Sequence, residues 1–130
     1  MSKQISDSEK IKALDDITSI KNISLKPGFL IEDIELLAQV CDDSEHFAEA
    51  VKQTCHHLAL LVLDKLHVSE LDYNYKDYKS CHYQSRKIPG QKADMRIVYK
   101  REGEKILVKG FGNRWIPDKI YLRLAKRLHE

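Results

Sequence analysis

The chain of 130 residues contains little of what marks flexible, disulfide-bonded or membrane-inserted proteins. Five glycines and three prolines are too few for a long flexible linker. Three cysteines without a Cys-x-x-Cys pair argue against a disulfide framework. The first residues lack the apolar core of a signal peptide, and the longest apolar run, Leu58–Leu63, is far shorter than the ~20 residues that cross a bilayer. We therefore expect a cytoplasmic protein that does not enter a membrane.

Several common catalytic patterns are also missing. The sequence has no P-loop, no dinucleotide-binding glycine pattern and no Ser or Cys nucleophile motif. The adjacent residues Cys55, His56 and His57 would point around a helix rather than toward one ion. The stretch 72–77 begins like a calcium loop but lacks the glycine and the final glutamate of such a loop. We expect neither a metal nor a cofactor.

Charge is distributed unevenly along the chain. Residues 1–75 carry 7 Lys/Arg against 14 Asp/Glu, a net charge of −7, whereas residues 76–130 carry 15 against 6, a net charge of +9. Such a split is typical of a polyanion-binding surface, or of an acidic segment that covers a basic one. The alternative is that each half simply solvates its own surface.

The acidic half has the spacing of helices. Apolar residues recur every three or four positions in three stretches, separated by a turn expected at 26–28, and these stretches are 8–20, 30–40 and 44–67. The third is the best defined, because Asp42 and Glu45 have the spacing of a capping box. We interpret residues 1–41 as an acidic N-terminal helical extension and residues 42–130 as the main domain.

The basic half has the spacing of strands. A strand is expected over 80–88, and a hairpin over 95–100 and 105–111 with a four-residue connection. Alternation places Ile97 and Tyr99 on one face of the sheet, and Arg96, Val98 and Lys100 on the other. A closing helix is expected from Ile116, with Pro117 in its first turn and with core positions at Ile120, Leu124 and Leu128. The fold class is therefore α+β, an antiparallel sheet packed by helices.

Four short motifs in this half resemble those of the RelE/ParE toxin superfamily, over residues 80–127. They are Ser85-Arg86-Lys87-Ile88, which is most similar to the YoeB branch, Met95-Arg96-Ile97-Val98-Tyr99, Gly112-Asn113-Arg114, and Tyr121. The resemblance implies a RelE-like sheet. In that family a first strand leads into a helical hairpin, and residues 1–41 show no convincing strand, hence their interpretation as an extension.

The resemblance also implies an activity, because the RNA-cleaving members of the family are mRNA endonucleases, either ribosome-dependent or not. Arg86 and Lys87 match the basic residues before the loop, and Arg96 matches the strand arginine that holds the scissile phosphate. Arg114 matches the arginine after the last strand, and Tyr121 a tyrosine near the closing region. A metal-independent endoribonuclease is therefore one expectation.

The residue types fit that chemistry in part. Cleavage of RNA through its own 2′-hydroxyl needs a base, positive charge on the phosphate and an acid. Arginine suits the phosphate because its planar guanidinium stays charged. His82 is a candidate acid or base, or else a surface residue on a strand. Tyr121 would act if nearby cations lowered its pKa, and otherwise packs the closing helix. The candidate catalytic residues are Arg96, Arg114, Tyr121 and His82.

Other residues are candidates for contact with RNA, namely Arg86, Lys87, Lys92, Lys109 and Trp115. Trp115 would stack on a base, although a lone tryptophan between two elements is also typical of a core plug. The alternative for each cation is a solvated charge or a surface ion pair.

Two functions follow as hypotheses. The first is a RelE-like toxin of a toxin–antitoxin system, which acts on mRNA, on the ribosome or off it, inhibits translation and has a cognate antitoxin as partner. The second is a non-catalytic regulatory or phage-encoded protein of the same fold that binds nucleic acid or an acidic protein; attack on a topoisomerase, as by ParE, is a variant. A further hypothesis is that the acidic helices of residues 1–40 mask the basic half. The oligomeric state is not predicted.

Overall fold

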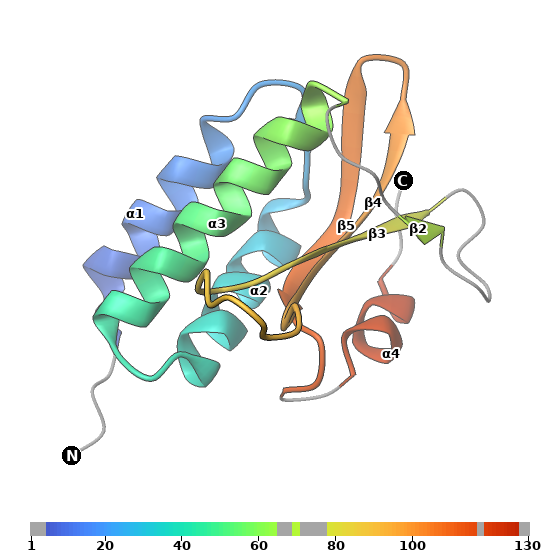
Figure 1. Ribbon diagram of the computed structural model, residues 1–130. Helices are drawn as coiled ribbons and strands as arrows, with labels where there is room; N and C mark the ends of the chain where they lie inside the picture. Colours follow the sequence, from blue (N-terminus) through green and yellow to red (C-terminus); the bar gives the residue numbers. More distant parts are fainter. Residues whose placement is uncertain (1–4, 65–68, 71–77, 117–118, 128–130) are drawn as a thin grey trace.

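The computed structural model describes residues 5–64, 69–70, 78–116 and 119–127 (Figure 1). Helices come first and strands second, and a short helix follows the last strand. In chain order the elements are α1 (Asp7–Thr18), β1 (Ile23–Ser24), α2 (Pro27–Val40), α3 (Ser44–Val62), β2 (Ser69–Glu70), β3 (Lys79–Tyr83), β4 (Met95–Glu102), β5 (Lys105–Asn113) and α4 (Ile120–Ala125).

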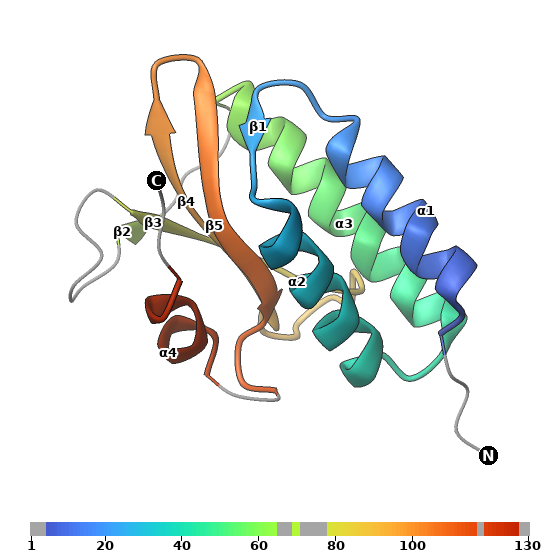
Figure 2. The same cartoon turned by 180° about the vertical axis from the view of Figure 1, so that it is seen from behind.

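The strands form one mixed sheet in the order β1-β5-β4-β3-β2. The pairs β2·β3, β3·β4 and β4·β5 are antiparallel, as the sequence predicts, whereas β1 pairs with β5 in parallel. Figure 2 shows β1 beside β5 and leading directly into α2. The predicted α+β class is confirmed, and the prediction of a wholly antiparallel sheet is wrong because of the two-residue strand β1.

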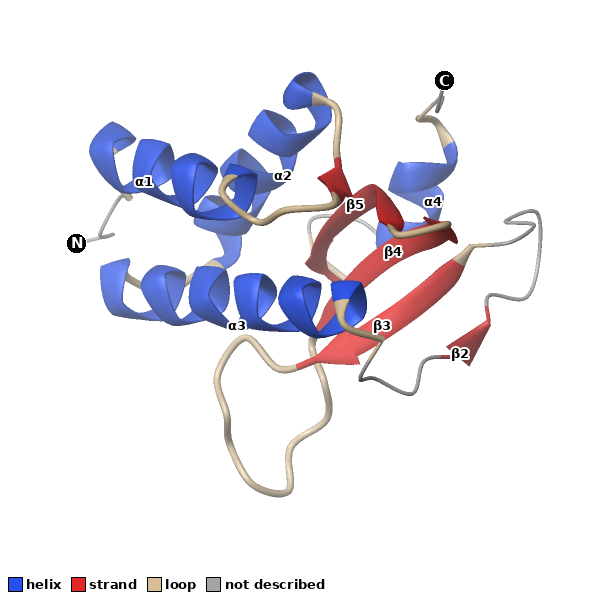
Figure 3. Ribbon diagram, turned by 90° about the horizontal axis from the view of Figure 1, so that it is seen from above, coloured by secondary structure: helices blue, strands red, loops and turns tan. Residues whose placement is uncertain are grey.

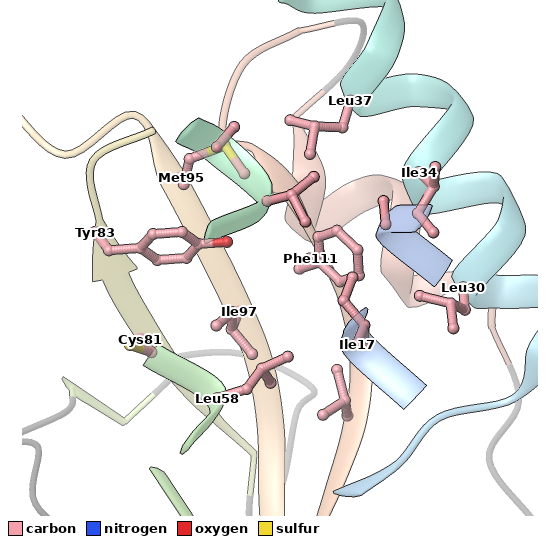
Figure 4. Packing of buried hydrophobic residues seen from close by; sticks show 14 of the residues in the cluster. Ile17, Leu30, Ile34, Leu37, Leu58, Cys81, Tyr83, Met95, Ile97 and Phe111 are labelled. Carbon is pink, nitrogen blue, oxygen red and sulfur yellow. The ribbon is translucent and has the colours of Figure 1, made fainter. Parts of the chain in front are cut away.

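Helices cover both faces of the sheet, α1, α2 and α3 on one face and α4 on the other (Figure 3). We call these the three-helix face and the α4 face. The predicted alternation along β4 is confirmed, since Ile97 and Tyr99 belong to the main core, whereas Val98 packs with Ile120 and Leu124 of α4. Figure 4 shows side chains of the helices and the sheet meeting around Phe111 in the main core.

Local chemistry explains where the helices begin. Ser6 and Glu9 form a capping box at the start of α1. Asp43 caps α3 by accepting from the backbone N–H of His46, so the cap lies one residue after the predicted Asp42. Pro27 is the first residue of α2, and the turn predicted at 26–28 is therefore the beginning of that helix.

Other helix and strand boundaries also differ from the prediction, and α3 ends at Val62 rather than near residue 67. Strand β3 ends at Tyr83 rather than residue 88, because a loop begins where Ser85 donates two hydrogen bonds to Asp94. Strands β4 and β5 pair as far as Glu102 and Lys105, which leaves a two-residue turn with Gly103 at a φ of 61°. Helix α4 begins at Ile120 rather than residue 116. The predicted positions Pro117 and Leu128 lie outside the described residues.

Strand β1 pairs only with Ile106 and Leu107 of β5. Charged side chains cover the part of this edge that β1 leaves unpaired. Farther along β5, the backbone N–H of Phe111 donates to Asp33 of α2 at 3.1 Å. Arg123 donates to the carbonyl of Phe111 at 3.3 Å, and Arg127 to that of Lys109 at 3.0 Å. These bonds replace the partners that a neighbouring strand would supply, and they anchor α4 to the sheet.

Candidate nucleic-acid interface

The four predicted catalytic residues come together on the α4 face. His82 of β3 lies opposite Arg96 of β4, and Arg96 lies opposite Gly112 of β5. The backbone N–H of Arg114 bonds to the carbonyl of Asp94 at 2.8 Å, and its carbonyl accepts from Ile120 at 2.9 Å. These two bonds fix Arg114 between the sheet and the start of α4. Tyr121 follows Ile120 in that helix.

The lowered pKa of His82 also indicates that Arg96 and Arg114 lie near its side chain. Its side chain is exposed, yet its pKa is lowered from the ordinary value of 6.5 by partial burial and then by the charges of Arg96 and Arg114. Both guanidiniums therefore lie close enough to repel a proton from the imidazole. At neutral pH, His82 is held in the uncharged form that can accept a proton.

Tyr121 spans two strands from its place on α4. Its hydroxyl hydrogen-bonds the hydroxyl of Ser80 on β3 at 2.8 Å and also interacts with the guanidinium of Arg96 on β4. Ser80 is 1% exposed, so the Tyr121 hydroxyl points into the face rather than toward solvent. Tyr121 also packs against the cluster of Val98, Ile120 and Leu124, which is the packing role weighed for it.

Arg96 is the most enclosed member of the group. Its side chain is 3% exposed, and its Nη1 atom donates to the carbonyls of Ala93 and Met95 at 2.9 and 2.8 Å. Its Nε atom is buried without a hydrogen-bond partner among the residues described. Burial lowers the pKa of Arg96, and Tyr121 opposes that shift. In this position Arg96 supplies positive charge from beneath the surface, and its guanidinium is not accessible for a two-pronged contact with a phosphate.

Trp115 is held beside Arg114 and is 54% exposed, so the alternative of a core plug is wrong. The Arg114 guanidinium carbon lies 4.4 Å from the centre of the indole ring, and the Lys119 ammonium lies 5.9 Å from it. An exposed aromatic ring thus sits between two cations at the edge of the α4 face.

A second cationic group lies farther along the same face. The ammonium groups of Lys109 and Lys100 lie 4.9 and 5.5 Å from the ring centre of Tyr78. The pKa of Lys109 is lowered by burial and then by the charges of Arg127 and Lys100. Lys109 therefore lies on the α4 face, four residues before the end of β5.

The remaining predicted RNA contacts lie elsewhere. Arg86 is in the loop after β3, where it pairs with Asp42 at 3.9 Å and with Asp43 at 3.6 Å at the start of α3. Lys87 lies near His57 of α3, whose pKa it helps to lower. Lys92 is exposed in the same loop. The structure thus does not join these three to the group around Arg96.

One arrangement resembles a catalytic triad but lacks its chemistry. The hydroxyl of Ser85 lies 3.0 Å from Nε2 of His46 and donates to Asp94 at 2.6 Å. Nδ1 of His46 accepts from the backbone N–H of Asp42, which assigns the ring proton to Nε2. The imidazole therefore donates to Ser85 and cannot take its proton. The three side chains tie the 84–94 loop to α3.

The acidic N-terminal helices do not lie over the cationic group. Ala13 and Ile17 of α1 are buried in the main core on the three-helix face. A groove of about 990 Å³ between α1 and α3 is lined by residues of these helices, among them Glu9, Asp16 and Val51, and by none of the predicted site residues. The masking hypothesis therefore finds no support from the position of α1. Glu32 and Asp33 of α2 neutralise Arg123 and Arg127 at the C-terminal end of the described chain.

The described residues include no group of three or more His, Cys, Asp and Glu side chains that could hold a metal ion. No helix in the described part of the chain is long and apolar enough to cross a membrane. No protein-family model, curated protein or solved structure matches the chain. The functions considered for the α4 face therefore rest on its own geometry.

Sequence reasoning missed three residues of this face, namely Ser80, Lys100 and Lys119. Ser80 could have been found, since it is two residues before His82 and the strand period of two places both on one face. Lys100 was placed on the correct face by the same alternation but was not assigned a role. The closeness of Lys119 to Trp115 could not have been predicted, because both residues lie between β5 and α4, where no periodic pattern applies.

Proposed function

We propose that the α4 face binds RNA and that the protein is a RelE-like toxin, a metal-independent endoribonuclease that acts on mRNA and inhibits translation. The observation that supports this proposal best is the convergence of His82, Arg114 and Tyr121 around the buried Arg96. A base candidate, a cation and an acid candidate thus lie near one another, although they come from β3, from the segment after β5 and from α4.

Each residue has a distinct task in the proposed reaction. Neutral His82 accepts the proton of the ribose 2′-hydroxyl, which then attacks the adjacent phosphorus. Arg114 donates to the non-bridging phosphate oxygens as negative charge grows on them. The hydroxyl of Tyr121, which lies against Ser80 in the RNA-free protein, turns outward to donate a proton to the departing 5′-oxygen. The products are a 2′,3′-cyclic phosphate and a 5′-hydroxyl, so no water or metal enters the first step.

Arg96 serves as a positioning residue in this scheme. Its guanidinium is tied to two backbone carbonyls and interacts with Tyr121. The buried charge favours the neutral form of His82. Arg96 thus orients the acid candidate and keeps the base candidate uncharged.

The order of elements supports the RelE-like part of the proposal. Strand β1 precedes the helices α2 and α3, and three antiparallel strands and a closing helix follow. This is the sequence of elements that the resemblance implies, with α1 added in front and the two-residue strand β2 before β3. A toxin of this kind has a cognate antitoxin protein as its partner.

The enclosure of Arg96 favours a second candidate, a non-catalytic protein of the same fold. Its side chain is 3% exposed, so a phosphate reaches it only if Tyr121 or α4 moves. A protein that binds RNA with the half-buried Arg114 and the exposed Lys119 would need no such movement. It would bind with an affinity that falls as salt rises and would leave the RNA intact.

Induced expression tests the proposal against this alternative. The wild type should stop growth, and its purified form should cleave RNA in the presence of EDTA and leave cyclic phosphate ends. His82→Ala and Arg114→Ala should each lower cleavage about 100-fold or more, whereas Lys92→Ala, in the loop away from the site, should match the wild type. Salt-sensitive binding without cleavage would support the non-catalytic protein. Unimpaired growth with no RNA binding would refute both.

A further inference from the structure

Trp115 is the only tryptophan of the chain, and its exposure is unusual for so large an aromatic side chain. The segment that carries it is well fixed. The side-chain oxygen of Asn113, at the end of β5, accepts from the backbone N–H groups of Trp115 and Ile116 at 2.9 and 3.0 Å. Such an Asx-type turn holds the backbone below the ring. The indole is thus presented to solvent from a defined position.

The surroundings of the ring combine flat apolar surface with positive charge. The guanidinium carbon of Arg114, the residue before Trp115, lies 4.4 Å from the centre of the ring. The ammonium nitrogen of Lys119, four residues after Trp115, lies 5.9 Å from it. Ile116, the residue after Trp115, adds exposed apolar surface at 56% exposure. A ligand that suits all of these features carries a flat ring next to negative charge.

We propose that Trp115 is the stacking platform for one unpaired nucleobase, next to the phosphate that Arg114 holds, so that the site takes single-stranded and not duplex RNA. This inference rests on the proposed function and adds its substrate class. A base inside a duplex has both faces stacked on its neighbours, and it reaches an indole only after it has been flipped out. An unpaired base stacks without that cost, whatever its identity.

The single tryptophan makes the stacking directly measurable. A single-stranded RNA of eight nucleotides should quench the fluorescence of the wild type as it binds, and the matched duplex should bind at least tenfold more weakly. Trp115→Ala should weaken binding of the single strand by about 5- to 100-fold, and Trp115→Phe by less, because a smaller ring still stacks. Since the side chain is exposed, both variants should unfold at the same urea concentration as the wild type.

Abasic nucleotides separate stacking from other effects of the substitution. One abasic position in the oligonucleotide should weaken binding to the wild type as much as Trp115→Ala does. The same abasic position should then have no further effect on the Trp115→Ala variant. Additive losses would mean that the indole and the missing base do not meet, and would overturn the inference.

The outcomes also distinguish this inference from the proposed function. If the wild type binds single-stranded RNA and Arg114→Ala abolishes binding, while Trp115→Ala binds as the wild type does, the platform is refuted and the RNA site stands. That result would assign the exposed apolar side chains of Trp115 and Ile116 to a protein partner. If the wild type binds no single-stranded RNA, the proposed function and the platform both fail.

Discussion

Asp33 and Arg127 lie 94 residues apart in the sequence and form a two-pronged ion pair, with distances of 2.9 Å from Nη1 to Oδ2 and 2.6 Å from Nη2 to Oδ1. Asp33 is fully buried, and Arg123 donates to the same carboxylate at 2.6 Å. Burial raises the pKa of Asp33, and the two guanidiniums oppose that shift. This pair fixes α4 to α2 and so holds Tyr121 over the sheet.

Asp33→Asn should destabilise the protein by about 3–5 kcal/mol, because it leaves two largely buried guanidiniums with only the half-exposed Glu32 as a counter-charge. Urea denaturation followed by circular dichroism measures the free energy of unfolding. Glu35→Gln is the matched control, since Glu35 pairs with Lys10 at 3.2 Å on the surface of α2, and its loss should cost at most about 1 kcal/mol. Equal effects of the two substitutions would contradict a special role for Asp33.

Gly110→Ala should displace α4. A Cβ atom at this position would lie 2.4 Å from a methyl group of Leu124 and 2.6 Å from Nη1 of Arg127, so both side chains must move. We expect a loss of about 1–3 kcal/mol in stability and a larger fractional loss of RNA binding than of folded protein. Gly28→Ala in α2 meets nothing within 4 Å and should leave both properties unchanged or slightly improve stability. Wild-type RNA affinity in Gly110→Ala would show that α4 does not hold the site.

The titration of His82 should depend on its neighbours. Its lowered pKa means that the folded protein favours the neutral imidazole, so the stability from His82 is complete above the unfolded value near 6.5 and is lost as pH falls toward the folded value. Arg114→Ala removes a repelling charge and should raise the pKa of His82. A bound oligonucleotide should raise it too. NMR titration of the histidine ring protons measures the pKa of His82 in the wild type, in Arg114→Ala and in the complex with the oligonucleotide. An identical pKa in all three would show that His82 does not interact with the cationic group.

Tyr121→Phe tests the proposed acid. The hydroxyl is removed while the ring that packs on Val98 and Leu124 remains, so stability should fall by only about 1 kcal/mol. The rate of RNA cleavage should fall about 100-fold or more if the hydroxyl protonates the leaving oxygen. Ser80→Ala removes the other partner of the same hydrogen bond and should lower the rate far less. A cleavage rate that is unaffected by Tyr121→Phe would assign Tyr121 to packing alone.

Deletion of residues 1–20 should destabilise the protein rather than activate it. Ala13 and Ile17 are buried against the main core on the side of the sheet away from the cationic group. Their loss exposes apolar surface of α2 and α3, and we expect a cost of several kcal/mol. RNA affinity per folded molecule should stay the same. A stable deletion variant with tighter RNA binding would instead revive the masking hypothesis.

Where a periodic pattern extends over many residues, the sequence was sufficient to predict the fold. The alternation along β4 separated Ile97 and Tyr99 from Arg96 and Val98 because every second side chain meets the same layer. The two-residue strand β1 has no room for such a pattern, so the parallel pairing was missed. Likewise, nothing about Asp33 in the sequence shows that it is buried, since its two arginine partners are distant in the chain.

The candidate site was predictable by residue type but not by arrangement. The resemblance singled out Arg96, Arg114 and Tyr121, and their meeting with His82 depends on the strand register, which no local pattern contains. Arg86 and Lys87 were predicted for the same site and lie toward α3, because β3 ends before them. The burial of Arg96 also follows from the position of α4, which is set by Asp33.

The ion pair of Asp33 and Arg127 also fixes an order of assembly. During synthesis, α4 leaves the ribosome after every strand of the sheet, so the buried carboxylate waits for its partners while the main core is already able to form. Contacts over such a separation form slowly, because a long loop must close first. We therefore expect Tyr121 to reach Ser80 and Arg96 late in folding, so that a growing chain presents the sheet before it presents a complete site.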